Sequence, residues 1–133
     1  MSYIHLIFGI ILFVVFLITG KFMRVDFPDK ELIPQELRLL MRSRHIYILL
    51  SALAHILLGL YLQISKDLWR KSLQFLGSFL LISASVLLVW AFFAETYMEK
   101  HFSDISRYGL YASLWGTILH IFGGFRLKSK KDD

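Results

Sequence analysis

Four long apolar segments that contain no proline limit what this 133-residue chain can fold into. They cover residues 3–22, 45–64, 72–94 and 108–125, and a bilayer core of about 30 Å takes about 20 helical residues. A membrane barrel would instead need short alternating strands, and these segments do not alternate. The sequence therefore predicts an all-α integral membrane protein, an antiparallel four-helix transmembrane bundle. We expect a single membrane domain over residues 1–133, with a charged tail at 126–133.

Composition excludes several other classes. The chain is 56% hydrophobic, which is too apolar for a soluble domain of this size. Its net charge of +5 comes from basic residues at the ends of the apolar segments. That placement indicates contact with anionic lipid headgroups and argues against nucleic acid as a partner. Because the chain has no cysteine, disulfides, thiolate ligands and thiol catalysis are excluded.

The two ends of the first apolar segment favour a retained helix over a signal peptide. Met1 and Ser2 carry no side-chain positive charge, and no small-residue cleavage motif precedes Lys21. After this segment, Pro34 is followed by QELRLLMRSR, in which Leu37, Leu40 and Met41 share a face. This pattern predicts a short interfacial amphipathic helix between spans one and two, separate from the second span or continuous with it.

Basic residues are almost evenly divided between the two membrane sides. The side of the termini has seven and the other side has eight. The basic tail and the short basic link at 65–71 favour cytoplasmic termini in a bacterial-type inner (plasma) membrane. The expected partners are the lipid bilayer and either a second copy of this chain or a larger membrane complex.

Apart from His45, the first residue of the second segment, three histidines lie within the apolar segments, each four residues from a glycine. Small residues mark the faces on which membrane helices pack, so we expect these histidines to point into the bundle. From the predicted span ends, their depths are about 3 Å for His5, 8 Å for His120 and 14 Å for His55. The interior polar or ligand candidates are His5, His55, His120, Ser51, Ser85 and Thr117; further hydroxyl partners are Ser78, Ser83 and Ser113.

A second group of polar residues lies at the opposite membrane surface. The end of span three has two glutamates four residues apart, which places both carboxylates on one helix face. Carboxylates with histidine can form a metal site or an acid–base pair, and the plain alternative is a solvated helix end with salt bridges. These surface-site candidates are Arg42, Arg44, His45, Glu95, Glu99 and His101.

Three functions fit this pattern. The first is non-enzymatic: passage of a small solute or protons past titratable imidazoles, or service as an accessory subunit. The second is b-type haem binding with bis-His ligation, by His120 with His55 or His5. The third is a membrane enzyme with a Glu/His site at the surface.

The structural alternative for each buried histidine is a neutral ring hydrogen-bonded to a neighbouring helix. No phosphate-binding, nucleophile or metalloprotease motif is present, so the sequence assigns no catalytic residue and no metal ligand.

Overall fold

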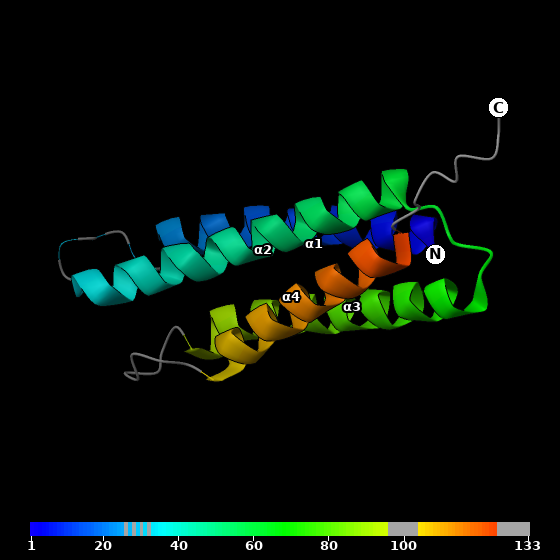
Figure 1. Cartoon of the computed structure of the whole chain (residues 1–133). Coiled ribbons are helices and arrows are strands. Elements are labelled where there is room, and N and C mark those ends of the chain that lie inside the picture. Colours follow the sequence, from blue (N-terminus) through cyan, green and yellow to red (C-terminus); the bar gives the residue numbers. More distant parts are fainter. Residues whose placement is uncertain (26, 28, 30, 32, 96–103, 125–133) are drawn as a thin grey trace, which may run out of the picture.

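The structure, a computed structural model, describes residues 1–25, 27, 29, 31, 33–95 and 104–124. Over these residues the chain forms four α-helices and no strand, which confirms the all-helical prediction. The helices are α1 (Ser2–Val25), α2 (Gln35–Tyr61), α3 (Leu68–Glu95) and α4 (Asp104–Gly124) (Figure 1). The tail at 126–133 lies outside the described residues.

Three of the helices, α1, α2 and α3, are long and apolar enough to cross a membrane. The fourth, α4, does not reach the same hydropathy. The reason is visible in its sequence, because glycines, hydroxyl-bearing residues and one histidine dilute its apolar residues, among them Gly109, Ser113, Gly116, Thr117, His120 and Gly123.

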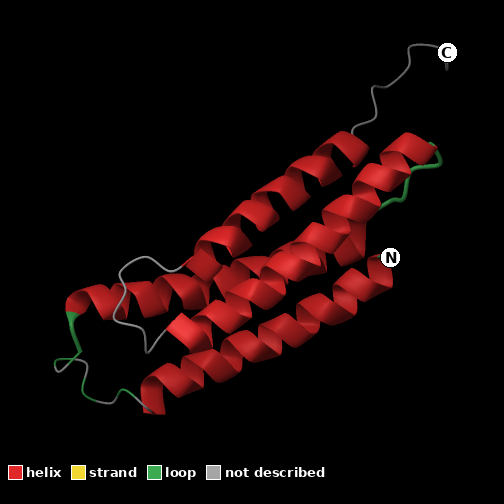
Figure 2. Ribbon diagram, turned by 90° about the horizontal axis from the view of Figure 1, so that it is seen from below, coloured by secondary structure: helices red, strands yellow, loops and turns green. Residues whose placement is uncertain are grey.

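The helices form two hairpins that face each other. α1 packs along α2, α3 packs along α4, and α2 faces α3 (Figure 1). All four run roughly along one long axis (Figure 2). The N-terminus, the link from α2 to α3 and the end of α4 lie at the same end of the bundle. Cross-helix hydrogen bonds agree, since His5 near the start of α1 bonds to His55 in the second half of α2.

Glycines allow close backbone contact within each hairpin. A Cβ on Gly59 of α2 would lie 2.6 Å from the Cα of Leu6 on α1. In the other hairpin, a Cβ on Gly116 of α4 would lie 2.9 Å from the carbonyl oxygen of Gly77 on α3. Real Cβ atoms do not come this close, so the helices of each pair can pack at this distance only because these positions are glycine.

The predicted amphipathic helix before span two is not a separate element. Helix α2 begins directly after Pro34 and continues without interruption to Tyr61. No proline occurs within this range and its only glycine is Gly59, near the end, so nothing in residues 35–58 breaks the helix. The segment therefore forms the first turns of α2, which was the continuous form of the prediction.

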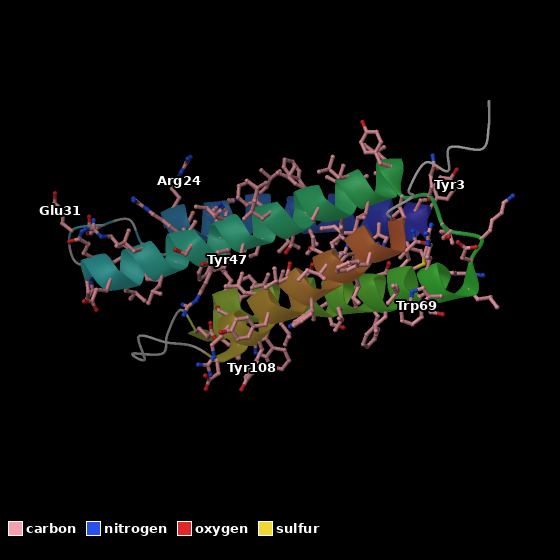
Figure 3. All side chains as sticks on the ribbon, in the orientation of Figure 1. Tyr3, Arg24, Glu31, Tyr47, Trp69 and Tyr108 are labelled. Atoms are coloured by element: carbon pink, nitrogen blue, oxygen red, sulfur yellow. The ribbon has the colours of Figure 1, made fainter. Side chains whose placement is uncertain are left out.

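The distribution of polarity is inverted relative to a soluble protein. Among the described residues, eleven polar or charged residues are buried and only nine hydrophobic ones. Large apolar side chains instead cover the outer surface, among them Ile10, Leu57 and Phe79 (Figure 3). An apolar exterior over a polar interior suits a lipid environment, in which buried polar groups hold helices together.

Candidate functional site: a buried histidine cluster

Three histidines from three helices meet in the bundle. His5, His55 and His120 are 0%, 1% and 8% exposed, which confirms that all three point inward. The Nδ1 atoms of His5 and His55 lie 2.7 Å apart, and the two rings are nearly parallel (20°) with centroids 4.9 Å apart. The His120 ring meets the His5 ring edge-on, with centroids 6.0 Å apart. The expected depths, which place His5 and His55 far apart, are wrong, because helix packing and not the predicted span ends sets the relative depth of the rings.

Two serines of α3 hold the outer nitrogens of these rings. Ser78 Oγ lies 2.9 Å from His5 Nε2 and 3.0 Å from His120 Nε2. Ser85 Oγ lies 3.0 Å from His55 Nε2. We call the three histidines with Ser78 and Ser85 the histidine cluster.

The direction of each serine hydroxyl and the position of the ring protons depend on each other. Ser78 donates its only hydroxyl proton to the carbonyl of Gln74 at 2.8 Å. In this orientation its oxygen only accepts, so both nitrogens that contact it would carry protons. Ser85 likewise donates to the carbonyl of Leu81 at 2.8 Å, which places a proton on His55 Nε2.

With both hydroxyls turned to their own helix, the His5–His55 pair would hold three ring protons. In that orientation each Nε2 donates to a serine, and the contact between the two Nδ1 atoms needs one proton more. Three ring protons on two imidazoles carry one positive charge. The pair becomes neutral when Ser85 turns its proton towards His55, or when Ser78 turns its proton towards His5.

The cluster can consequently relay a proton. A proton that arrives at the Ser78 end can shift across the Nδ1–Nδ1 contact while another leaves at the Ser85 end, and hydroxyl rotation resets the chain. Imidazole is suited to such transfer because its neutral and charged forms are both accessible near neutral pH in water. Chains of histidine and hydroxyl groups serve as proton relays in membrane proteins.

One end of the cluster opens into a groove. The groove has a volume of about 750 Å³ and lies between the ends of α2 and α4; its lining includes Leu57, Tyr61, Ser65, Gln74, His120 and Gly124. His120 Nδ1 is buried and has no hydrogen-bond partner among the described residues. Gln74 closes the turn beside the groove, since its Oε1 accepts from Ser65 N at 2.9 Å and its Nε2 donates to Gln63 O at 3.0 Å.

The other end of the cluster is closed by apolar side chains. On α2, Ile48 and Ala52 precede His55, and on α3 the residues Leu88 and Phe92 follow Ser85. All four are buried, with at most 3% of their surface exposed. We call these four residues the apolar layer. It separates the histidine cluster from the polar residues at the far end of the bundle.

Beyond the apolar layer, Arg44 and Glu95 form a buried ion pair. Arg44 Nε lies 3.2 Å from Glu95 Oε2, and the two side chains are 4% and 1% exposed. The carboxylate also accepts from the backbone of Ile105 at 3.1 Å and from the hydroxyl of Ser106 at 2.7 Å. Glu95 therefore caps the N-terminus of α4, where the helix dipole favours a negative charge.

The other predicted surface-site residues do not join this pair. His45 Nδ1 lies 2.9 Å from Thr19 Oγ1, and its ring stacks on Phe16 of α1 with centroids 4.1 Å apart. Arg42 is exposed. Glu99 and His101 lie outside the described residues. Within the described part of the chain, no three histidine, aspartate or glutamate residues are grouped to hold a metal ion.

The interior candidates have different outcomes. Ser85 belongs to the histidine cluster, and Ser51 is buried but bonds to no described residue. The prediction is wrong for Thr117, which is exposed and donates to the carbonyl of Ser113 in its own helix. Thr117 adjoins the inward glycine of α4 in sequence, and one helical step carries it about 100° round the axis, away from the core.

Two important residues were not selected as site candidates from the sequence. Ser78 was one hydroxyl among several, yet it joins His5 to His120. Gln74 was missed, although it is 1% exposed and closes the turn between α2 and α3. A signal for both was available, because Gln74, Gly77 and Ser78 follow the three- and four-residue spacing of a helix face.

The geometry of the histidine cluster restricts which pair of histidines could ligate a haem. His5 and His55 contact each other directly, so a porphyrin has no space between these two rings. His55 and His120 both direct Nε2 towards a serine. Ligation by that pair would require both rings to turn. Haem binding stays a prediction, which the visible absorption spectrum of the purified protein tests.

Comparison of the chain with known protein families, with curated proteins and with solved structures finds no match. The site is therefore interpreted through its own geometry. Its defining features are the His5–His55 pair joined through its Nδ1 atoms, the two serines that flank it and the groove at one end.

Proposed function

We propose that this chain is a non-enzymatic integral membrane protein that passes protons, alone or with a small solute, through the histidine cluster. The observation that supports this function is the 2.7 Å contact between the Nδ1 atoms of His5 and His55, with a serine at each outer nitrogen. A histidine that only held two helices together would need a single hydrogen-bond partner on a neighbouring helix. Here the rings and hydroxyls form one continuous chain that can exchange a proton.

The outer face of α4 supports four membrane spans rather than three. Its exposed side chains are aromatic or aliphatic over most of its length: Tyr108, Tyr111, Leu114, Trp115, Ile121 and Phe122. Its glycines and His120 face the bundle. The helix is therefore apolar where it would meet lipid, and its lower hydropathy comes from the packed face. The basic residues in the link after α2 and in the tail support cytoplasmic termini in an inner membrane.

The proposed route begins at the groove. A proton reaches His120 from the groove and then passes through Ser78, His5 and His55 to Ser85. The apolar layer blocks the next step, so complete passage requires this layer to hydrate or to separate. Hydrophobic constrictions gate other membrane pathways by excluding water. With the apolar layer closed, the cluster is a proton site that is accessible only from the groove.

Proton flux into liposomes tests this function. Purified protein is reconstituted with a trapped pH-sensitive dye, and an outward potassium gradient with valinomycin supplies the driving force. We expect His55→Gln to reduce flux to that of empty liposomes, because an amide cannot exchange a proton as imidazole does. His45→Gln is the matched control, since it is the same substitution in the same helix outside the cluster. Equal flux in wild type and His55→Gln would disprove proton passage through the cluster.

Access through the groove has a separate test. A Cβ at Gly124 would meet no atom of the described residues within 4 Å, so a larger side chain has room there at the edge of the groove. We expect Gly124→Leu to lower proton flux while the protein keeps its melting temperature. Unchanged flux in Gly124→Leu would exclude the groove as the route to His120.

A further inference from the structure

A second pocket lies at the opposite end of the bundle from the histidine groove. It is formed where α1 ends and α2 begins, and its volume is about 210 Å³. Figure 3 labels Arg24 at this end. Three arginines and several apolar side chains line the pocket, among them Arg24, Arg38, Arg42, Met23, Phe27 and Met41. We call it the arginine pocket.

The positive charge of this pocket is not neutralised by described residues. Arg24, Arg38 and Arg42 form no ion pair with any residue in the described part of the chain. Arg38 Nε is buried and has no hydrogen-bond partner there. The described acidic residues of this end, Asp29, Glu31 and Glu36, do not line the pocket. A buried guanidinium donor without a partner is costly, so the pocket favours an anionic ligand.

The shape and position of the pocket define the class of anion. Guanidinium groups present paired donors that match the oxygens of a phosphate. The apolar lining suits carbon atoms attached to that phosphate. The pocket also lies at the ends of two membrane-spanning helices, which is the level of lipid headgroups. Its volume suits a phosphate with the glycerol carbons beside it and is too small for a porphyrin.

We propose that the arginine pocket binds the phosphate group of an anionic glycerophospholipid, with the glycerol backbone against Met23, Phe27 and Met41. The lipid would hold the end of α1 against the start of α2. This inference does not depend on proton passage, because the pocket and the histidine cluster share no residue.

Native mass spectrometry of the full chain in a neutral detergent tests the proposal. The probes are phosphatidic acid, phosphatidylglycerol and a diacylglycerol with the same acyl chains but no phosphate. The pocket variant combines Arg24→Gln, Arg38→Gln and Arg42→Gln. The matched control combines Lys66→Gln, Arg70→Gln and Lys71→Gln, which removes the same charge from the other end of the bundle. Circular dichroism and melting temperature establish that both variants fold.

The expected result is a loss of lipid adducts that is specific to the pocket variant. Losing charge-assisted hydrogen bonds should weaken phospholipid binding by about tenfold or more. The control variant should bind as wild type does, diacylglycerol should not bind, and excess inorganic phosphate should not displace the lipid. Arg38→Lys, which keeps the charge but removes the buried Nε donor, should give an intermediate loss.

Three results would overturn the proposal. The pocket variant could retain its phospholipid adducts, or the two triple variants could lose them equally, which would indicate a general charge effect. Displacement of the lipid by inorganic phosphate would instead identify a site for small anions.

Discussion

The Nδ1 atoms of His5 and His55 face each other at 2.7 Å, and their outer nitrogens bond to two serines of the same helix. Ser78 and Ser85 are seven residues apart, or two helical turns, so α3 presents both hydroxyls on one face. Helix α3 therefore acts as a rigid support on which the rings from α1 and α2 are aligned. The pair is poised to hold one proton between its rings.

The first prediction concerns the serine at the inner end of the relay. Ser85→Ala removes the group that accepts from His55 Nε2 and can turn to donate to it, so we expect proton flux to fall. Ser85→Thr keeps the hydroxyl and should retain most of the flux. Ser51→Ala is the control, because Ser51 lies one turn before His55 and bonds to no described residue. Equal flux in all three variants, measured in dye-loaded liposomes, would exclude Ser85 from the relay.

The second prediction concerns the apolar layer. Leu88→Ser places a hydroxyl between Ser85 and the far end of the bundle, where water is otherwise excluded. We expect a higher proton flux than in wild type, since the layer is the barrier to complete passage. The same assay with Val86→Ser, on the outward face of α3, controls for the polarity of the new side chain. A flux in Leu88→Ser no higher than in wild type would show that the layer is not the gate.

The third prediction concerns the buried ion pair. Glu95→Ala leaves the Arg44 charge buried without its partner and removes the cap of α4, so we expect a loss of about 3–5 kcal/mol in the free energy of unfolding. Arg107→Gln is the contrasting variant, because its pair with Asp104 is exposed and should contribute at most about 1 kcal/mol. Unfolding in mixed micelles with increasing sodium dodecyl sulfate measures both. Similar losses for the two variants would contradict the structural role of Glu95.

The fourth prediction concerns packing of α1 on α2. In Gly59→Ala, the added methyl group would overlap the backbone of Leu6 and force the helices apart. Overpacking of this kind costs about 1–3 kcal/mol, which the same unfolding measurement can detect. Gly124→Ala should leave stability nearly unchanged, because no atom of the described residues lies within 4 Å of the added Cβ. A stable Gly59→Ala protein would mean that the two backbones are not in contact there.

The helices and the inward direction of the histidines could be predicted from the sequence. Apolar length indicated the helices, and the glycine four residues from each histidine indicated the packed face. Such patterns are local, because a helix repeats its faces every three to four residues. The side chain of Thr117 shows the limit of this reasoning, since one helical step separates the packed face of α4 from its outer face.

Contacts between helices could not be predicted in the same way. The depth of His5 relative to His55 depends on how α1 slides along α2, and that is set by the fit of Gly59 against Leu6. The prediction that His45 and Glu95 belong to one surface site was also wrong, because His45 lies on the side of α2 that faces Thr19 of α1. Sequence spacing reports which residues share a helix face, and it does not report which other helix that face meets.

The central claim is that His5 and His55 act as one proton site. Solid-state nitrogen NMR of protein labelled with ¹⁵N-histidine in lipid bilayers tests it directly. We predict a correlation between the two Nδ1 atoms across their hydrogen bond, and a joint change of both rings when one proton is added. His5→Gln should then shift the His55 signal, whereas His45→Gln should not. Two rings that titrate independently, without a correlation between their Nδ1 atoms, would contradict the claim.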